Sequence, residues 1–78
     1  MNIQVLAGKV DRIENDLALA RLAWQAGKML TFRHHLMLAC REYQSLESVH
    51  PRLWRRFENE VQSLCSEVTQ AELAELES

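Results

Sequence analysis

Cysteine is scarce in this sequence, with Cys40 and Cys65 the only two among 78 residues. This density is far below that of a secreted disulfide scaffold. No apolar run is long enough for a signal peptide or a membrane span. We therefore expect a cytoplasmic protein with no membrane contact, in which both cysteines are reduced and buried as small apolar side chains.

Motifs that carry chemistry are missing as well. The chain has no glycine-rich phosphate loop, no serine in a strained turn and no recognisable Cys–His pair. His34, His35 and His50 show none of the paired ligand spacings that are typical of zinc sites. We expect a protein that is not an enzyme and that needs no metal, cofactor or small molecule.

Apolar residues, in contrast, make up 47% of the chain and recur at intervals of three and four. A helix turns once per 3.6 residues, so such a run lines one side of a helix, whereas a half-buried strand would alternate strictly. The sequence therefore predicts an all-α fold in one domain over residues 1–78. Its three apolar runs are Ile3, Leu6, Val10, Ile13, Leu17, Ala20, Trp24; Phe32, Leu36, Ala39, Tyr43, Leu46; and Phe57, Val61, Leu64, Val68.

The breaks between the runs set the expected helix limits. Gly27 suits the left-handed residue that follows a helix, and Thr31 is the expected N-cap of the next one. Pro51 suits the first turn of the third helix. Gly8 weakens the opening turn of the first helix, which frays or starts after it. The expected helices cover residues of about 3–27, 31–48 and 51–68.

The linkers are short, so neighbouring helices should be antiparallel. This predicts a three-helix bundle, or an extended helical hairpin plus a third helix, either of which dimerisation can complete. Leu19 and Leu22 make the first apolar stripe wider than the seam of a two-stranded coiled coil. We therefore expect this stripe to form either the core of a bundle or the seam of a dimer. Near the C-terminus, Thr69 and Glu72 match a capping box, which predicts a short helix over 70–77 or one unbroken helix.

Charge is unevenly distributed along the chain. From residue 58 onward the only charged side chains are glutamates, whereas Arg52, Arg55 and Arg56 open the third expected helix. The helix macrodipole disfavours each such arginine by about 0.3 to 1 kcal/mol, so these residues do not serve helix stability. They form either a solvated face or, with Trp54, a partner-binding surface of the kind rich in arginine and tryptophan. Trp24, at the end of the first run, is a further partner-binding candidate.

The sequence therefore predicts a small helical protein-binding module, such as an adaptor, regulator, inhibitor or co-chaperone. Its partner is another protein or a second copy of the chain. The alternative is a small dimeric nucleic-acid-binding regulator that uses the Arg52, Arg55 and Arg56 patch on phosphates. A net charge of −2 and the acidic tail argue against nucleic acid. We expect the tail to fold back on the arginines or to pair with them between chains.

Two stretches resemble known families. Gly27, Ala39, Tyr43 and Pro51 resemble the residue types of one tetratricopeptide repeat, a unit that needs stacked neighbours to fold. Residues 32–68 resemble the small helical co-chaperones of type III secretion needle subunits, through the helix up to Tyr43, the turn at Pro51 and the third apolar run. That resemblance implies a helical hairpin that docks on a repeat-containing chaperone.

Overall fold

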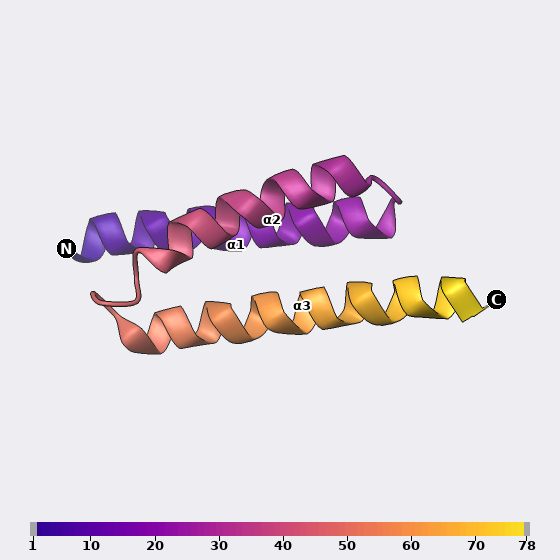
Figure 1. Cartoon of the computed structure of the whole chain (residues 1–78). Helices are drawn as coiled ribbons and strands as arrows, with labels where there is room; N and C mark the ends of the chain where they lie inside the picture. Colours follow the sequence, from indigo (N-terminus) through magenta and orange to yellow (C-terminus); the bar gives the residue numbers. More distant parts are fainter. Residues whose placement is uncertain (1, 78) are drawn as a thin grey trace.

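Three helices make up the computed structural model, which describes residues 2–77: α1 (Ile3–Gln25), α2 (Met29–Gln44) and α3 (Pro51–Glu77). Within this range there is no strand, so the all-α prediction is confirmed. α1 and α2 form an antiparallel hairpin, and α3 runs antiparallel to α2 beside it (Figure 1). The arrangement is elongated, with Cα extents of 50 × 19 × 13 Å.

The first turn of α1 is held by Asn2. Its side-chain Oδ1 accepts a hydrogen bond from the amide of Val5 at 2.8 Å, which satisfies one of the free amides at the start of a helix. The helix therefore starts at Ile3 and continues through Gly8, and the expected fraying at Gly8 is not observed.

The turn between α1 and α2 closes at Gly27, which has the predicted left-handed conformation with φ 74°. The amide of Lys28 then donates to the carbonyl of Ala23 at 2.8 Å, a pattern typical of helix ends that stop at glycine. α2 begins directly afterwards, with Lys28 as its N-cap and no side-chain cap hydrogen bond. The N-cap predicted at Thr31 is wrong, because the chain re-enters helical geometry two residues earlier.

α2 ends at Gln44, four residues before the predicted limit of 48. The amide of Leu46 turns back to the carbonyl of Tyr43 at 2.9 Å, which starts the tight turns over residues 45–49. His50 then caps α3, since its Nδ1 accepts a hydrogen bond from the amide of Leu53 at 3.3 Å. Pro51 is the first residue of α3, as predicted.

α3 is one unbroken helix of 27 residues, so the separate helix over 70–77 does not form. Its straight course places the acidic tail at the opposite end of the molecule from Arg52 and Arg55 (Figure 1). The tail therefore does not fold back on the arginines of its own chain, and this part of the prediction is wrong.

The core consists of two apolar clusters joined through Leu36, which packs against both. One cluster contains Ile13, Leu17, Ala39, Tyr43, Leu46, Phe57 and Val61, and the other contains Ala20, Ala23, Phe32, Leu64 and Val68. These residues come from the three predicted apolar runs, apart from Ala23. The periodicity of the sequence therefore identified nearly the whole core.

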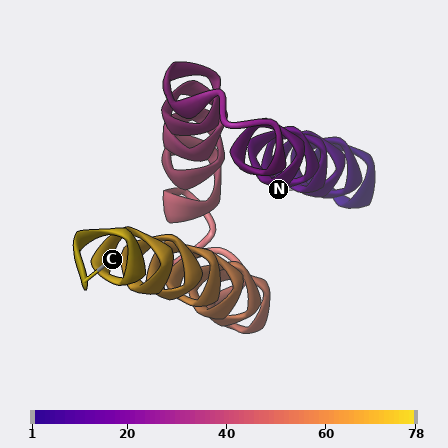
Figure 2. The ribbon, with the colours of Figure 1, turned by 90° about the vertical axis from the view of Figure 1, so that its right-hand side faces the viewer.

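Several of the side chains buried on α1 and α2 are smaller than those that α3 packs against them. Ala20, Ala23 and Ala39 are buried on α1 and α2, and side chains of this size allow the two backbones to approach closely. The large rings of Phe57 and Trp54 extend from α3 into the cluster between the helices. α3 is accordingly set apart from the α1–α2 pair, as the view along the helices shows (Figure 2).

The cysteines differ in exposure. Cys40 is half-buried, whereas Cys65 lies exposed on α3, so the predicted burial of Cys65 is wrong. The turn of α3 puts Cys65 outside the stripe of Val61, Leu64 and Val68 that faces the core. Both thiols are free. No helix within residues 2–77 has an apolar stretch of the length that a bilayer crossing requires.

Candidate partner-binding surface

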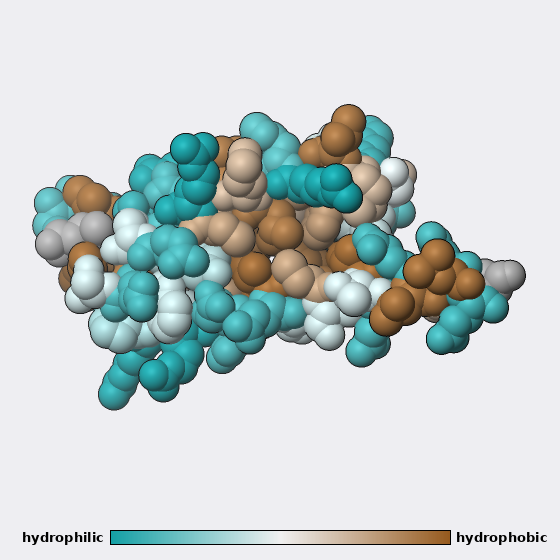
Figure 3. Space-filling model, viewed as in Figure 1, coloured by the Kyte–Doolittle hydropathy of each residue, from teal (hydrophilic) through white to brown (hydrophobic). Residues whose placement is uncertain are grey.

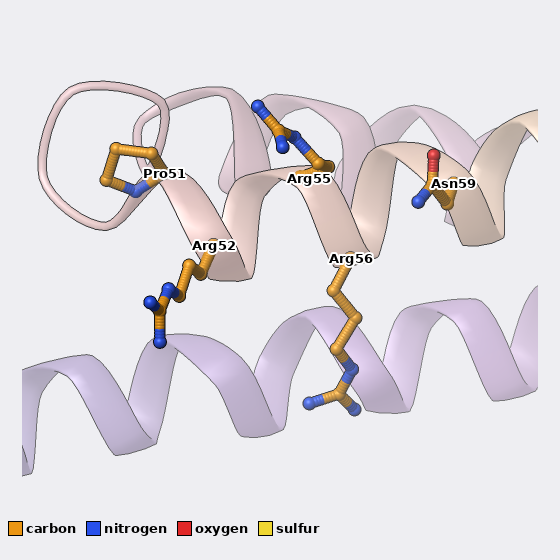
Figure 4. A pocket seen from close by; sticks show the side chains of 5 residues that line it. All are labelled: Pro51, Arg52, Arg55, Arg56 and Asn59. Atoms are coloured by element: carbon orange, nitrogen blue, oxygen red, sulfur yellow. The ribbon is translucent and has the colours of Figure 1, made fainter.

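The three predicted arginines line a shallow hollow on the first turns of α3, together with Pro51 and Asn59. They lie within about one turn of α3, because a helix turns once per 3.6 residues. The helix starts at Pro51, where His50 caps it. Figure 4 shows Arg52 and Arg56 extending to the side of α3 that faces α1, and Arg55 extending to the opposite side. The hollow is open to solvent along its length, since Arg52 and Arg55 are exposed.

The side chain of Arg56 is bound by other residues of its own chain. Its Nη2 donates to Oε1 of Glu14 on α1 at 2.6 Å, and its Nε lies 3.6 Å from Oε1 of Glu60. The guanidinium also lies over the ring of Phe57, 5.1 Å from the centroid. Arg56 thus joins α3 to α1, and a partner would have to compete with Glu14 to reach it.

Arg52 and Arg55 make no hydrogen bond or ion pair with any residue that the structure describes. Each is exposed on α3. The predicted patch of three arginines is therefore divided, with two available to a partner and one held in the fold.

The two tryptophans lie away from this hollow. Trp54 is half-buried against the first core cluster, and its indole Nε1 is buried with no hydrogen-bond partner among the described residues. Trp24 packs against the second cluster, with its ring centroid 5.9 Å from that of Phe32. The structure brings together Arg52, Arg55 and Arg56, and it places both half-buried tryptophans outside this hollow, so their predicted part in partner binding stays a prediction.

Other titratable side chains are engaged between helices. Lys9 on α1 donates to Glu42 on α2 at 3.0 Å, and this hydrogen bond holds the pKa of Glu42 below its ordinary value. Nδ1 of His35 lies 3.0 Å from Oδ1 of Asp16, which joins the middle of the same two helices. These contacts fix the register of α1 against α2.

A further polar group lies between α2 and α3. The hydroxyl of Tyr43 donates to Glu58 at 2.5 Å, and Glu58 also accepts from Gln62 at 2.9 Å. Burial, followed by the bond to Glu58, raises the pKa of Tyr43 well above its ordinary value. Burial likewise raises the pKa of the Cys40 thiol, which keeps it protonated rather than activated as a nucleophile. Among residues 2–77, no three His, Cys, Asp or Glu side chains are arranged to hold a metal ion.

Sequence reasoning named Ile3, Leu19 and Leu22 but missed the exposed apolar side chains of α2 and of the end of α3. The helix period would have assigned Leu30 and Leu76 to outward faces, since neither continues the buried stripe of its helix. Figure 3 shows apolar atoms exposed near the start of α2 and at the end of α3. The large hydrophobic residues with high exposure are Ile3, Val5, Leu19, Leu22, Leu30, Met37, Val49, Leu73 and Leu76.

Comparison with known proteins finds no matching family model, no matching curated protein and no matching solved structure.

Proposed function

We propose that this protein is a small, non-catalytic protein-binding module of the adaptor, regulator, inhibitor or co-chaperone class. Arg52 and Arg55 are its contact to an acidic segment of a partner protein. The observation that carries the proposal is that both guanidinium groups are exposed beside one hollow and have no ion pair among the described residues. A cytoplasmic location is part of the proposal, and the low cysteine content supports it.

The electrostatics of α3 support this role. The start of a helix carries partial positive charge, and each arginine there costs about 0.3 to 1 kcal/mol of helix stability. Arg56 offsets its cost through Glu14, whereas Arg52 and Arg55 have no such compensation. Carboxylates from a partner would supply it, because arginine pairs with carboxylates through two parallel hydrogen bonds. Binding would then act by covering the face of α3 or by stabilising the partner.

Comparative affinity capture tests the proposal. Wild-type protein, the Arg52→Ala/Arg55→Ala variant and an Arg21→Ala/Lys28→Ala control are used as baits in an extract of the native host. The control removes the same charge from exposed positions of α1 and the turn after it. We expect a partner that the wild type and the control retain and the Arg52/Arg55 variant loses. Equal retention by all three baits would contradict the proposal.

Nucleic acid is the alternative ligand for the same arginines, and a titration with mixed-sequence DNA and RNA at low salt separates the two. Micromolar binding that collapses between about 50 and 200 mM salt would favour nucleic acid. We expect no binding. Arg56 is paired with Glu14, and every charged residue of α3 after Arg56 is a glutamate, which repels phosphates.

A further inference from the structure

The last turns of α3 extend past the end of the α1–α2 hairpin. The last buried residue of α3 is Val68, and the helix continues to Glu77 (Figure 1). In this overhang Leu73 is 54% exposed and Leu76 is 83% exposed. The two leucines are three residues apart and so share one side of the helix, with Glu72 and Glu77 beside them. The overhang is therefore an amphipathic acidic segment with two exposed leucines on one side.

α2 carries a matching surface. Leu30 is 83% exposed and Met37 is 50% exposed, and their spacing of seven residues places them on one side of the helix, two turns apart. Arg33 lies between them along the chain, is exposed and makes no hydrogen bond or ion pair with any described residue. This face of α2 thus combines uncovered apolar side chains with positive charge.

We propose that the protein associates with a second copy of itself, the α3 overhang of each copy packing on the exposed face of α2 of the other. Leu73 and Leu76 cover Leu30, and Glu72 lies near Arg33 of the second copy. Apolar burial supplies the affinity, and the flanking charges set the orientation.

The topology allows both contacts at once. Because α3 is antiparallel to α2, the end of α3 and the start of α2 lie at the same end of the molecule (Figure 1). A two-fold axis perpendicular to the helices, at this end of the molecule, therefore sets the overhang of each copy beside Leu30 of the other. The two equal contacts close the assembly as a dimer, as an isologous interface requires.

The arginine hollow is a poorer site for the overhang. Arg52 and Arg55 offer positive charge, but the hollow around them is lined by Pro51, Arg56 and Asn59 and contains no large apolar side chain. Leu73 and Leu76 would stay exposed there. The face of α2 offers both a positive charge to Glu72 and apolar side chains to Leu73 and Leu76. The dimer does not depend on the role proposed for Arg52 and Arg55.

Sedimentation equilibrium of the full chain tests the dimer. We expect the wild type to associate reversibly, and Leu73→Gln/Leu76→Gln to raise the dissociation constant about a hundredfold, since glutamine keeps the helix but removes the apolar contact. A wild type that stays monomeric up to about 1 mM would overturn the proposal, as would a dimer that the leucine changes leave intact. Circular dichroism checks that each variant remains helical.

Charge exchange tests the pairing itself. Arg33→Glu sets a carboxylate against Glu72 of the second copy, and Glu72→Arg sets a guanidinium against Arg33 of the second copy. We expect each variant alone to dimerise about tenfold more weakly than the wild type, and an equimolar mixture to recover the wild-type affinity as a heterodimer. Arg52→Glu, the same reversal in the arginine hollow, should change nothing. Variants that dimerise normally alone, or a mixture that fails to recover, would overturn the arrangement.

Discussion

Removal of the Tyr43 hydroxyl should change how stability depends on pH. Tyr43 is the only tyrosine of the chain, and its hydroxyl donates to the Glu58 carboxylate at 2.5 Å across the α2–α3 interface. Tyr43→Phe keeps the buried ring and deletes this bond. Hydrogen bonds to charged groups contribute about 1.5 to 3 kcal/mol. Glu58 keeps Gln62 as a partner, so we expect the lower end, about 1.5 kcal/mol at neutral pH.

The sign at alkaline pH follows from the raised pKa of Tyr43. The folded protein holds the phenolic proton more tightly than the unfolded chain, where tyrosine titrates near its ordinary value of about 10. Stability from this group is therefore complete below pH of about 10 and falls as the pH rises above it. By about pH 11 the unfolded chain has lost most of this proton, which lowers the free energy of unfolding by about 1.4 kcal/mol.

Urea unfolding of the two proteins at neutral pH and at about pH 11 measures the effect. The wild type should lose its advantage of about 1.5 kcal/mol over Tyr43→Phe almost completely at the higher pH. Lysines and cysteines also titrate over this range, but they do so in both proteins. Their contributions to the free energy of unfolding therefore largely cancel when the two proteins are compared. A repeat in a Cys40→Ala background removes the thiol that neighbours Tyr43 and should give the same change. A difference between the proteins that is constant with pH would refute the reasoning.

Three further changes test the packing. Phe57→Ala should lower the free energy of unfolding by about 3 to 5 kcal/mol, because the ring is fully buried and leaves a cavity; a loss under about 1 kcal/mol in urea unfolding would contradict the core assignment. Gly27→Ala should cost about 1 to 2 kcal/mol through its positive φ alone, since an added Cβ meets no atom within 4 Å; an unchanged melting temperature would argue against this turn. A double-mutant cycle of Arg56→Met and Glu14→Gln should give a coupling below about 1 kcal/mol that decreases with salt, because the side chains are 51% and 45% exposed. A salt-independent coupling would show that the pair is shielded from solvent.

Local signals in the sequence determined the helices and most of their core faces. The spacing by three and four identified Ile13, Leu17, Leu64 and others as buried, because a helical period dictates which residues share a side whatever the neighbours are. Gly27 marked a turn for an equally local reason, its tolerance of positive φ. Thr31 misled the prediction, since a residue type suited to a cap says nothing about whether the chain needs one there.

Only the tertiary structure decided which side chains outside the core are free to contact a partner. Arg52, Arg55 and Arg56 look alike in the sequence, yet Arg56 meets Glu14, which is 42 residues away along the chain. Whether a side chain at the edge of a helix is covered depends on how far that helix is rotated against its neighbours and on where the neighbours end. Leu73 and Leu76 are exposed because α2 starts level with the preceding turns of α3, and no local pattern encodes that offset. The physical reason is that these contacts join segments whose relative position is set by the packing of the whole core.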